Sequence, residues 1–180
     1  MDQLYCIYRS IEKSICSTIS ASFPSACIVS FLAFISYMVL RLFFSLHKNR
    51  SKNFSGVSGM VYQGVWTAIF TFYTYMVLFR TWIARKRWED PLDKIFGGWG
   101  LYTEKGNLTT EAIENVMLLF PFTFLLGILL TKRWKKYLPG SAFRYLALSG
   151  FFMSLTIETV QLLLKRGTFQ FSDLFYNTTG

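Results

Sequence analysis

The 180-residue sequence contains few residues of the kinds that build disulfide scaffolds and metal sites. It has three cysteines, with no paired spacing, and a single histidine, His47. A disulfide framework is normally signalled by an even number of cysteines at regular spacings, and a zinc site needs several Cys, His or carboxylate ligands. The sequence therefore predicts neither a disulfide-rich protein nor a metal site, and it contains no recognisable cofactor motif.

Acidic residues are also scarce, since ten Asp and Glu stand against nineteen Lys and Arg and leave a net charge of +9. In a soluble protein this excess would point to nucleic acid. Here the charges lie between long apolar runs, so we expect the basic loops to contact anionic lipid headgroups and predict no nucleic-acid partner. With 52% hydrophobic and 19% aromatic residues, the chain is too apolar for a small soluble domain or a disordered protein.

Four apolar stretches are long enough to cross a bilayer. They lie at about residues 26–46, at 53–79, at 115–131 and at 145–164. A further helix is predicted to begin at Asp173, with Ser172 as its N-cap. The sequence thus predicts an all-α integral membrane protein with four transmembrane helices and the start of a fifth.

Because consecutive spans alternate in direction, the end of the second, the start of the third and the end of the fourth share one side of the membrane. Polar residues occur at all three places: Arg80, Glu114, Asn115, Glu158, Gln161 and Arg166. Glu158 stands out because an ionised carboxylate inside a membrane costs roughly 2.5 to 3.5 kcal/mol on insertion scales. It should be protonated or paired, and Arg166 is the candidate partner in the nearby sequence. Gln161 lies on the same helical face as Glu158.

The predicted last helix also has a polar face. Asp173, Tyr176, Asn177 and Gly180 are spaced i, i+3, i+4 and i+7, and the glycine would let another helix approach closely. An acid in a first helical turn is favoured by the helix dipole as well, so Asp173 alone also has a structural explanation.

Proline 121 is the main irregularity of the third span. Pro121 removes a backbone donor and frees the carbonyl group of Met117, which must find another partner or line a polar cavity. For Pro121 by itself, an ordinary kink that helps packing is favoured over a functional role.

The third span, the fourth span and the last helix contain sequence segments that resemble those of a known protein family. They read EAIENVMLLFPF at residues 111–122, SLTIETVQ at 154–161, and Asp173 with NTTG at 177–180. With residues 75–80 of the second span, these segments resemble the VanZ-like family of bacterial membrane proteins. The resemblance divides the chain into residues 1–59, an N-terminal segment with an additional transmembrane helix, and residues 60–180, a VanZ-like membrane domain that ends before its last helix. Thr123 stands where the family usually has glycine.

The resemblance implies reduced susceptibility to lipid-bearing glycopeptide antibiotics such as teicoplanin, in a bacterial plasma membrane. Three interpretations of the polar residues remain open: a site that binds or acts on a cell-envelope or lipid-linked molecule, a transport or proton-coupling site of a small oligomeric transporter, or a buried network that only joins helices. The candidate site consists of Glu114, Asn115, Glu158, Gln161, Arg166, Asp173 and Asn177. No catalytic residue follows from these patterns, and enzymatic activity stays an open question.

Overall fold

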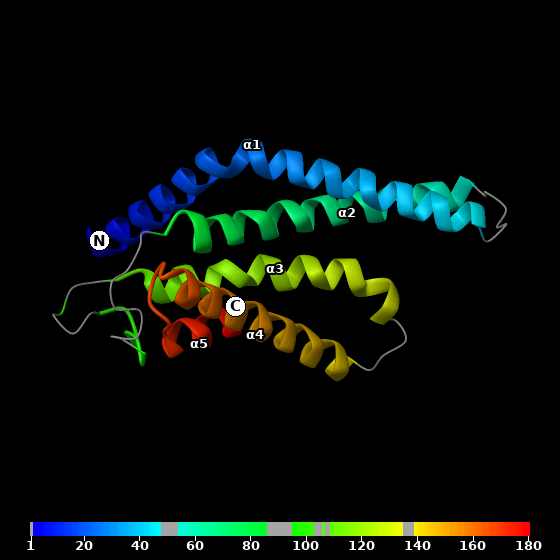
Figure 1. Cartoon of the computed structure of the whole chain (residues 1–180). Coiled ribbons are helices and arrows are strands. Elements are labelled where there is room, and N and C mark those ends of the chain that lie inside the picture. The colour runs from blue at the N-terminus through cyan, green and yellow to red at the C-terminus, as the bar shows by residue number, and fades with distance from the viewer. Residues whose placement is uncertain (1, 48–53, 86–94, 103–105, 107–108, 135–138) are drawn as a thin grey trace.

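The computed structural model describes residues 2–47, 54–85, 95–102, 106, 109–134 and 139–180. All regular elements in these ranges are helical, which confirms the predicted all-α class (Figure 1). In chain order they are α1 (Asp2–His47), α2 (Phe54–Leu78), the π-helix η1 (Phe79–Ile83), α3 (Glu111–Trp134), α4 (Pro139–Leu164) and α5 (Phe171–Thr179).

Three helices in the described part of the chain are long and apolar enough to cross a membrane. They cover Tyr5–Phe44, Glu111–Leu130 and Gly140–Leu164. The predicted count of four spans and the start of a fifth is therefore confirmed only for three. The other predicted span is helix α2, which has 25 residues but contains polar side chains such as Gln63 and Thr67 that lower its hydropathy.

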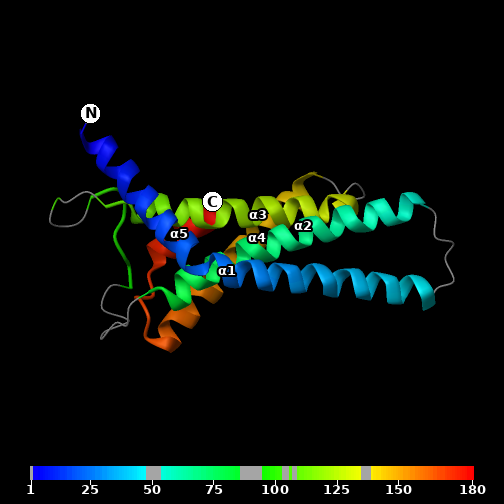
Figure 2. The ribbon, with the colours of Figure 1, turned by 90° about the horizontal axis from the view of Figure 1, so that it is seen from above.

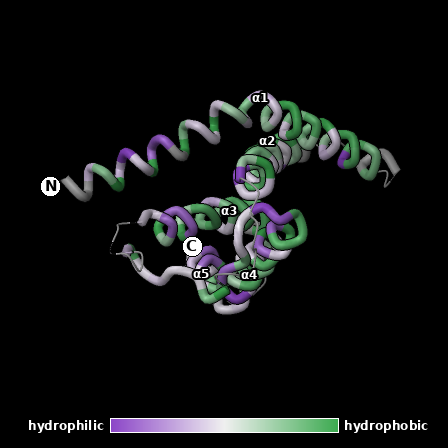
Figure 3. Tube along the Cα trace, turned by 60° about the vertical axis from the view of Figure 1, so that its left-hand side comes forward, coloured by the Kyte–Doolittle hydropathy of each residue, from purple (hydrophilic) through white to green (hydrophobic). Residues whose placement is uncertain are grey.

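Helix α1 is longer than predicted. The stretch expected at about residues 26–46 is only its second half, because the helix begins at Asp2. Charged residues near the N-terminus end an apolar run but not a helix, so the apolar pattern placed the start too late. Pro24 lies inside α1, and Figures 1 and 2 show a bend in the blue part of the helix, as expected where a proline removes a backbone hydrogen bond. Figure 3 shows hydrophobic residues along the second half of α1 and hydrophilic ones interrupting its first half.

The helices form two layers, with α1 and α2 above α3, α4 and α5 in the view of Figure 1. The apolar core between the layers consists of Val77, Leu119, Phe122 and Ile157. Next to this core, the Tyr73 hydroxyl donates a hydrogen bond to the backbone oxygen of Leu118 at 2.7 Å. A side chain of α2 is thus bonded to the backbone of α3 three residues before Pro121, and α3 continues as an α-helix through this proline.

Helix α5 begins at Phe171, two residues before the predicted start. Gln170 occupies the N-cap position without a side-chain cap, so the prediction of Ser172 as N-cap is wrong. Ser172 lies in the first turn and is fully buried. The chain turns at Gly167, whose φ is 94°, and Gln170 before the helix is extended.

The far end of α5 packs directly on the backbone of α3. A Cβ atom added to Gly180 would lie 1.8 Å from the backbone oxygen of Val116. This close approach agrees with the role predicted for the glycine. It holds the end of α5, and with it the polar face of α5, against α3.

Candidate functional site

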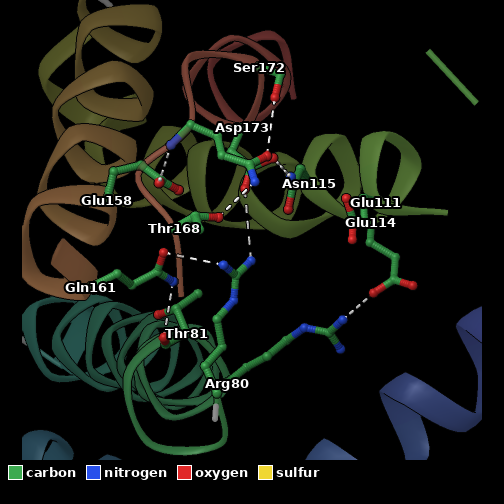
Figure 4. Close-up of polar contacts among 12 residues, drawn as sticks. Arg80, Thr81, Glu111, Glu114, Asn115, Glu158, Gln161, Thr168, Ser172 and Asp173 are labelled. Atoms are coloured by element: carbon green, nitrogen blue, oxygen red, sulfur yellow. Dashed lines mark hydrogen bonds and ion pairs between the residues drawn. The ribbon is translucent and has the colours of Figure 1, made fainter. Parts of the chain in front are cut away.

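Polar side chains from α3, α4, α5 and the segment after α2 meet where α4 ends and α3 and α5 begin (Figure 4). We call Arg85, Asn115, Glu158, Gln161 and Asp173 the polar cluster. Four of the five are buried, with exposed fractions of at most 8%, and Arg85 has a side-chain exposure of 36%. A polar group of this size inside a small helical membrane protein requires partners for each of its members.

Asp173 is held from two sides. Its Oδ1 accepts a hydrogen bond from Asn115 Nδ2 at 2.6 Å, and its Oδ2 lies 3.9 Å from a guanidinium nitrogen of Arg85. Burial raises the pKa of Asp173 to about 6, against the opposing effects of the positive charge of Arg85 and the hydrogen bond from Asn115, while the nearby Glu111 raises it further. Asp173 is therefore ionised near neutral pH and becomes protonated in mild acid.

Glu158 is 1% exposed and lies on the face of α4 that looks toward α5. Its Oε2 accepts a hydrogen bond from the backbone N–H of Gln170 at 3.3 Å. The expected partner, Arg166, lies elsewhere and donates to the backbone oxygens of Trp82 at 2.9 Å and Ile83 at 3.2 Å. That expectation is wrong because α4 ends before Arg166 and the following turn directs this residue to the end of η1.

Gln161 joins α4 to the end of η1. Its Nε2 donates to the backbone oxygen of Thr81 at 3.0 Å, and its Oε1 accepts a hydrogen bond from Arg85 at 3.4 Å. The last carbonyl groups of a helix have no partner within it, and a positive charge is favourable there. Gln161 and Arg166 therefore share a structural function as caps of η1.

Glu114 belongs to a separate contact. It forms an ion pair with Arg80 of η1 and accepts a hydrogen bond from the Thr110 hydroxyl at 2.7 Å. Figure 4 shows the Arg80 and Glu114 side chains to one side of Asp173 and Glu158. Of the two neighbours predicted in α3, only Asn115 thus reaches the polar cluster.

Three buried side-chain polar atoms find no hydrogen-bond partner among the described residues of the bundle. One is the indole Nε1 of Trp82 in η1, and the other two are Oδ1 of Asn177, a residue that is 2% exposed, and Oγ of Ser154, which is 0% exposed. Asn177 lies one turn beyond Asp173 on α5, and Ser154 lies one turn before Glu158 on α4. By helical spacing they extend the same two polar faces deeper into the bundle.

Arg85 and Ser154 were not among the predicted site residues. For Ser154 a signal exists, because it precedes Glu158 by four residues and Gln161 by seven. For Arg85 the sequence offers no such signal, since it opens the basic run Arg85, Lys86, Arg87 and nothing in the run marks one member. Its position depends on the π-turn that precedes it.

A glycine-rich segment covers the start of α5. The Ile95 backbone oxygen accepts from the N–H of Phe171 at 2.8 Å, and the N–H of Gly100 donates to the Tyr176 hydroxyl at 2.7 Å. A Cβ atom on Gly97, whose φ is 70°, would lie 1.9 Å from the Ser172 hydroxyl oxygen. Gly97 thus permits close packing on α5.

Comparison with known families gives one match. The model of the family described as VanZ/LLP1 matches residues 25–180, a region that begins in α1 and includes every helix of the polar cluster. The division of the chain at residue 60 stays a prediction. Searches among curated proteins and solved structures found no match. Since the family model covers most of the sequence, the chain belongs to the VanZ/LLP1 family.

Proposed function

We propose that this multi-pass protein lies in a bacterial plasma membrane and lowers susceptibility to lipid-bearing glycopeptide antibiotics such as teicoplanin. In this proposal the polar cluster binds or acts on a cell-envelope or lipid-linked molecule and so reduces access of the antibiotic to its target. Membership of the VanZ/LLP1 family supports the antibiotic role, and the chemistry of the cluster supports a site.

One observation carries the site proposal. Two carboxyl groups on neighbouring helices, Glu158 and Asp173, are 1% and 7% exposed. Among the described residues, the cationic group that pairs with them is the guanidinium of Arg85, at 3.9 Å from Asp173. Ionisable groups inside a membrane protein are costly and usually mark a functional site. A network that served only to join helices would be expected to pair both acids closely.

The second candidate, a purely structural network, has support of its own. Gln161 and Arg166 bind backbone carbonyl groups at the end of η1, as caps do. This role accounts for two of the predicted site residues and leaves Asn115, Glu158, Asp173 and Asn177 for the proposed site.

The test compares teicoplanin and vancomycin susceptibility of a sensitive Gram-positive host that expresses the wild-type chain, Glu158→Gln or neither. Glu12→Gln is the matched control, because Glu12 is exposed on α1. We expect protection against teicoplanin from the wild type and the control, and its loss in Glu158→Gln at equal membrane abundance. Full protection by Glu158→Gln would refute the site, and a loss proportional to reduced abundance would favour the structural network.

A further inference from the structure

The interior beside α4 and α5 offers more hydrogen-bond acceptors than donors. When ionised, the carboxylates of Glu158 and Asp173 only accept hydrogen bonds, and so does Oδ1 of Asn177. The donors that reach them are the N–H of Gln170, at 3.3 Å from Glu158, and Nδ2 of Asn115, at 2.6 Å from Asp173. Arg85 is 3.9 Å from the second oxygen of Asp173, beyond the length of a hydrogen bond.

Two of the three unpartnered atoms extend the polar faces of α4 and α5. Asn177 follows Asp173 by one turn on α5, and Ser154 precedes Glu158 by one turn on α4, so each pair projects from one face of its own helix. Asn177 Oδ1 and Ser154 Oγ have no hydrogen-bond partner within the described parts of the chain. Buried polar groups are normally satisfied, so this pair indicates a ligand group or ordered water at this level.

The local charge has a definite sign. Arg80 is paired with Glu114, and Arg166 binds the carbonyl groups of η1. Arg85 alone faces the two buried acids from the described segments around them, and its side chain is partly exposed. A phosphate or carboxylate group would meet two carboxylates here, whereas a cation would be attracted.

We infer that the polar faces of α4 and α5 bind the protonated primary amine of an envelope molecule, with Glu158, Asp173 and Asn177 as its acceptors. The inference rests on the proposed function and names the chemical group that the site takes. A primary ammonium has one positive charge, three N–H donors and no acceptor, which matches two carboxylates and one amide oxygen. A divalent metal ion would require six or more oxygen ligands, or several retained waters.

Arg85 acts as a competitor of the ligand in this arrangement. Its contacts with Gln161, at 3.4 Å, and with Asp173, at 3.9 Å, are long, so the amine can displace it at small cost. The amine can come from a lipid headgroup or from the peptide part of a cell-wall precursor. Both sources present the same ammonium group, and the experiment separates them.

The experiment measures binding to the purified full chain in detergent by native mass spectrometry. The lipid probes are phosphatidylethanolamine and phosphatidylcholine with identical acyl chains, because choline has the charge but no N–H donor. Alanine methyl ester is the soluble probe for a peptide amine. We expect phosphatidylethanolamine or alanine methyl ester to bind, the lipid at least tenfold more tightly than phosphatidylcholine if the headgroup is the source.

The variants decide the role of each residue. Glu158→Gln, Asp173→Asn and Asn177→Leu should each weaken amine binding at least tenfold, while Glu12→Gln leaves it unchanged. Arg85→Gln should strengthen binding severalfold, because it removes the competing cation. Size-exclusion chromatography and thermal unfolding identify any variant that fails to fold. If the acid variants fail to fold, Arg85→Gln still tests the inference.

Three results would overturn the inference: no binding of either amine probe, equal binding of the two phospholipids without binding of alanine methyl ester, or weaker amine binding by Arg85→Gln. The last would mean that Arg85 holds an anionic ligand. If Glu158→Gln loses teicoplanin protection although no amine binds, the proposed function stands and the amine assignment fails.

Discussion

Asn115 donates a hydrogen bond to Asp173 across 2.6 Å and so joins α3 to α5 inside the helix bundle. The bond fixes one carboxylate oxygen of Asp173 and leaves the other toward Arg85. Burial of this carboxylate is costly, and the hydrogen bond offsets part of that cost. The pair therefore links the packing of the short helix α5 to the ionisation of a single group.

The first prediction concerns the pH dependence of stability. The pKa of Asp173 in the folded protein is about 6, whereas the ordinary value for an aspartate side chain is 3.8. The folded protein therefore binds this proton more tightly than the unfolded chain does. Ionisation of Asp173 then destabilises the fold, and stability rises as pH falls from about 6 toward 3.8. The full effect is on the order of 2 to 3 kcal/mol.

The measurement is thermal unfolding in detergent between pH 7.5 and 4.5 for the wild type and Asp173→Asn. The wild type should gain stability relative to the variant as the pH falls through 6. Glu12→Gln, which changes an exposed acid, should follow the wild-type curve. Parallel curves for wild type and Asp173→Asn would show that Asp173 titrates as an ordinary exposed acid.

The second prediction concerns the glycine-rich segment over α5. Gly97 has a φ of 70°, and its added Cβ would lie 1.9 Å from the Ser172 hydroxyl oxygen. Gly97→Ala should therefore lower stability by about 1 to 3 kcal/mol through backbone strain, in addition to the clash. The neighbouring Gly98 is the matched control, since an added Cβ there meets nothing within 4 Å. Unfolding temperatures should fall for Gly97→Ala and stay close to wild type for Gly98→Ala.

The third prediction concerns the cap of η1. Arg166 donates to the backbone oxygens of Trp82 and Ile83, the last two residues of η1. Arg166→Gln should lower stability by about 1 kcal/mol and leave amine binding intact. Lys165→Gln removes an exposed charge of the same sign next to it and should be neutral. If Arg166→Gln abolished ligand binding without loss of stability, Arg166 would belong to the site after all.

Local patterns in the sequence predict much of the candidate site. The spacing of Glu158 and Gln161, and that of Asp173 and Asn177, predicts a shared helical face in each case, because helical periodicity depends only on residues a few positions apart. The predicted alternation of spans puts these faces at the same side of the membrane. The structure indeed brings Asn115, Gln161 and Asp173 into one cluster.

Pairing between helices could not be predicted in the same way. The sequence favoured Arg166 as partner of Glu158 because it is close along the chain, yet a turn at Gly167 directs it to η1. Arg85 is 88 residues from Asp173 by number and is indistinguishable in composition from the basic residues after it. Such contacts depend on how helices rotate against each other, which no local pattern specifies.

The orientation of Arg85 depends on the π-turn at the end of α2. The N–H of Ala84 donates to the backbone oxygen of Phe79 at 2.9 Å, five residues back, so η1 contains one residue more than an α-helical turn. One extra residue shifts the phase of everything after it by about 100°. Removing a single residue from Phe79–Ile83 would therefore turn Arg85 to another face of the bundle while leaving its sequence neighbours unchanged. The length of one helical turn thus decides whether the Arg85 guanidinium lies beside the buried Asp173.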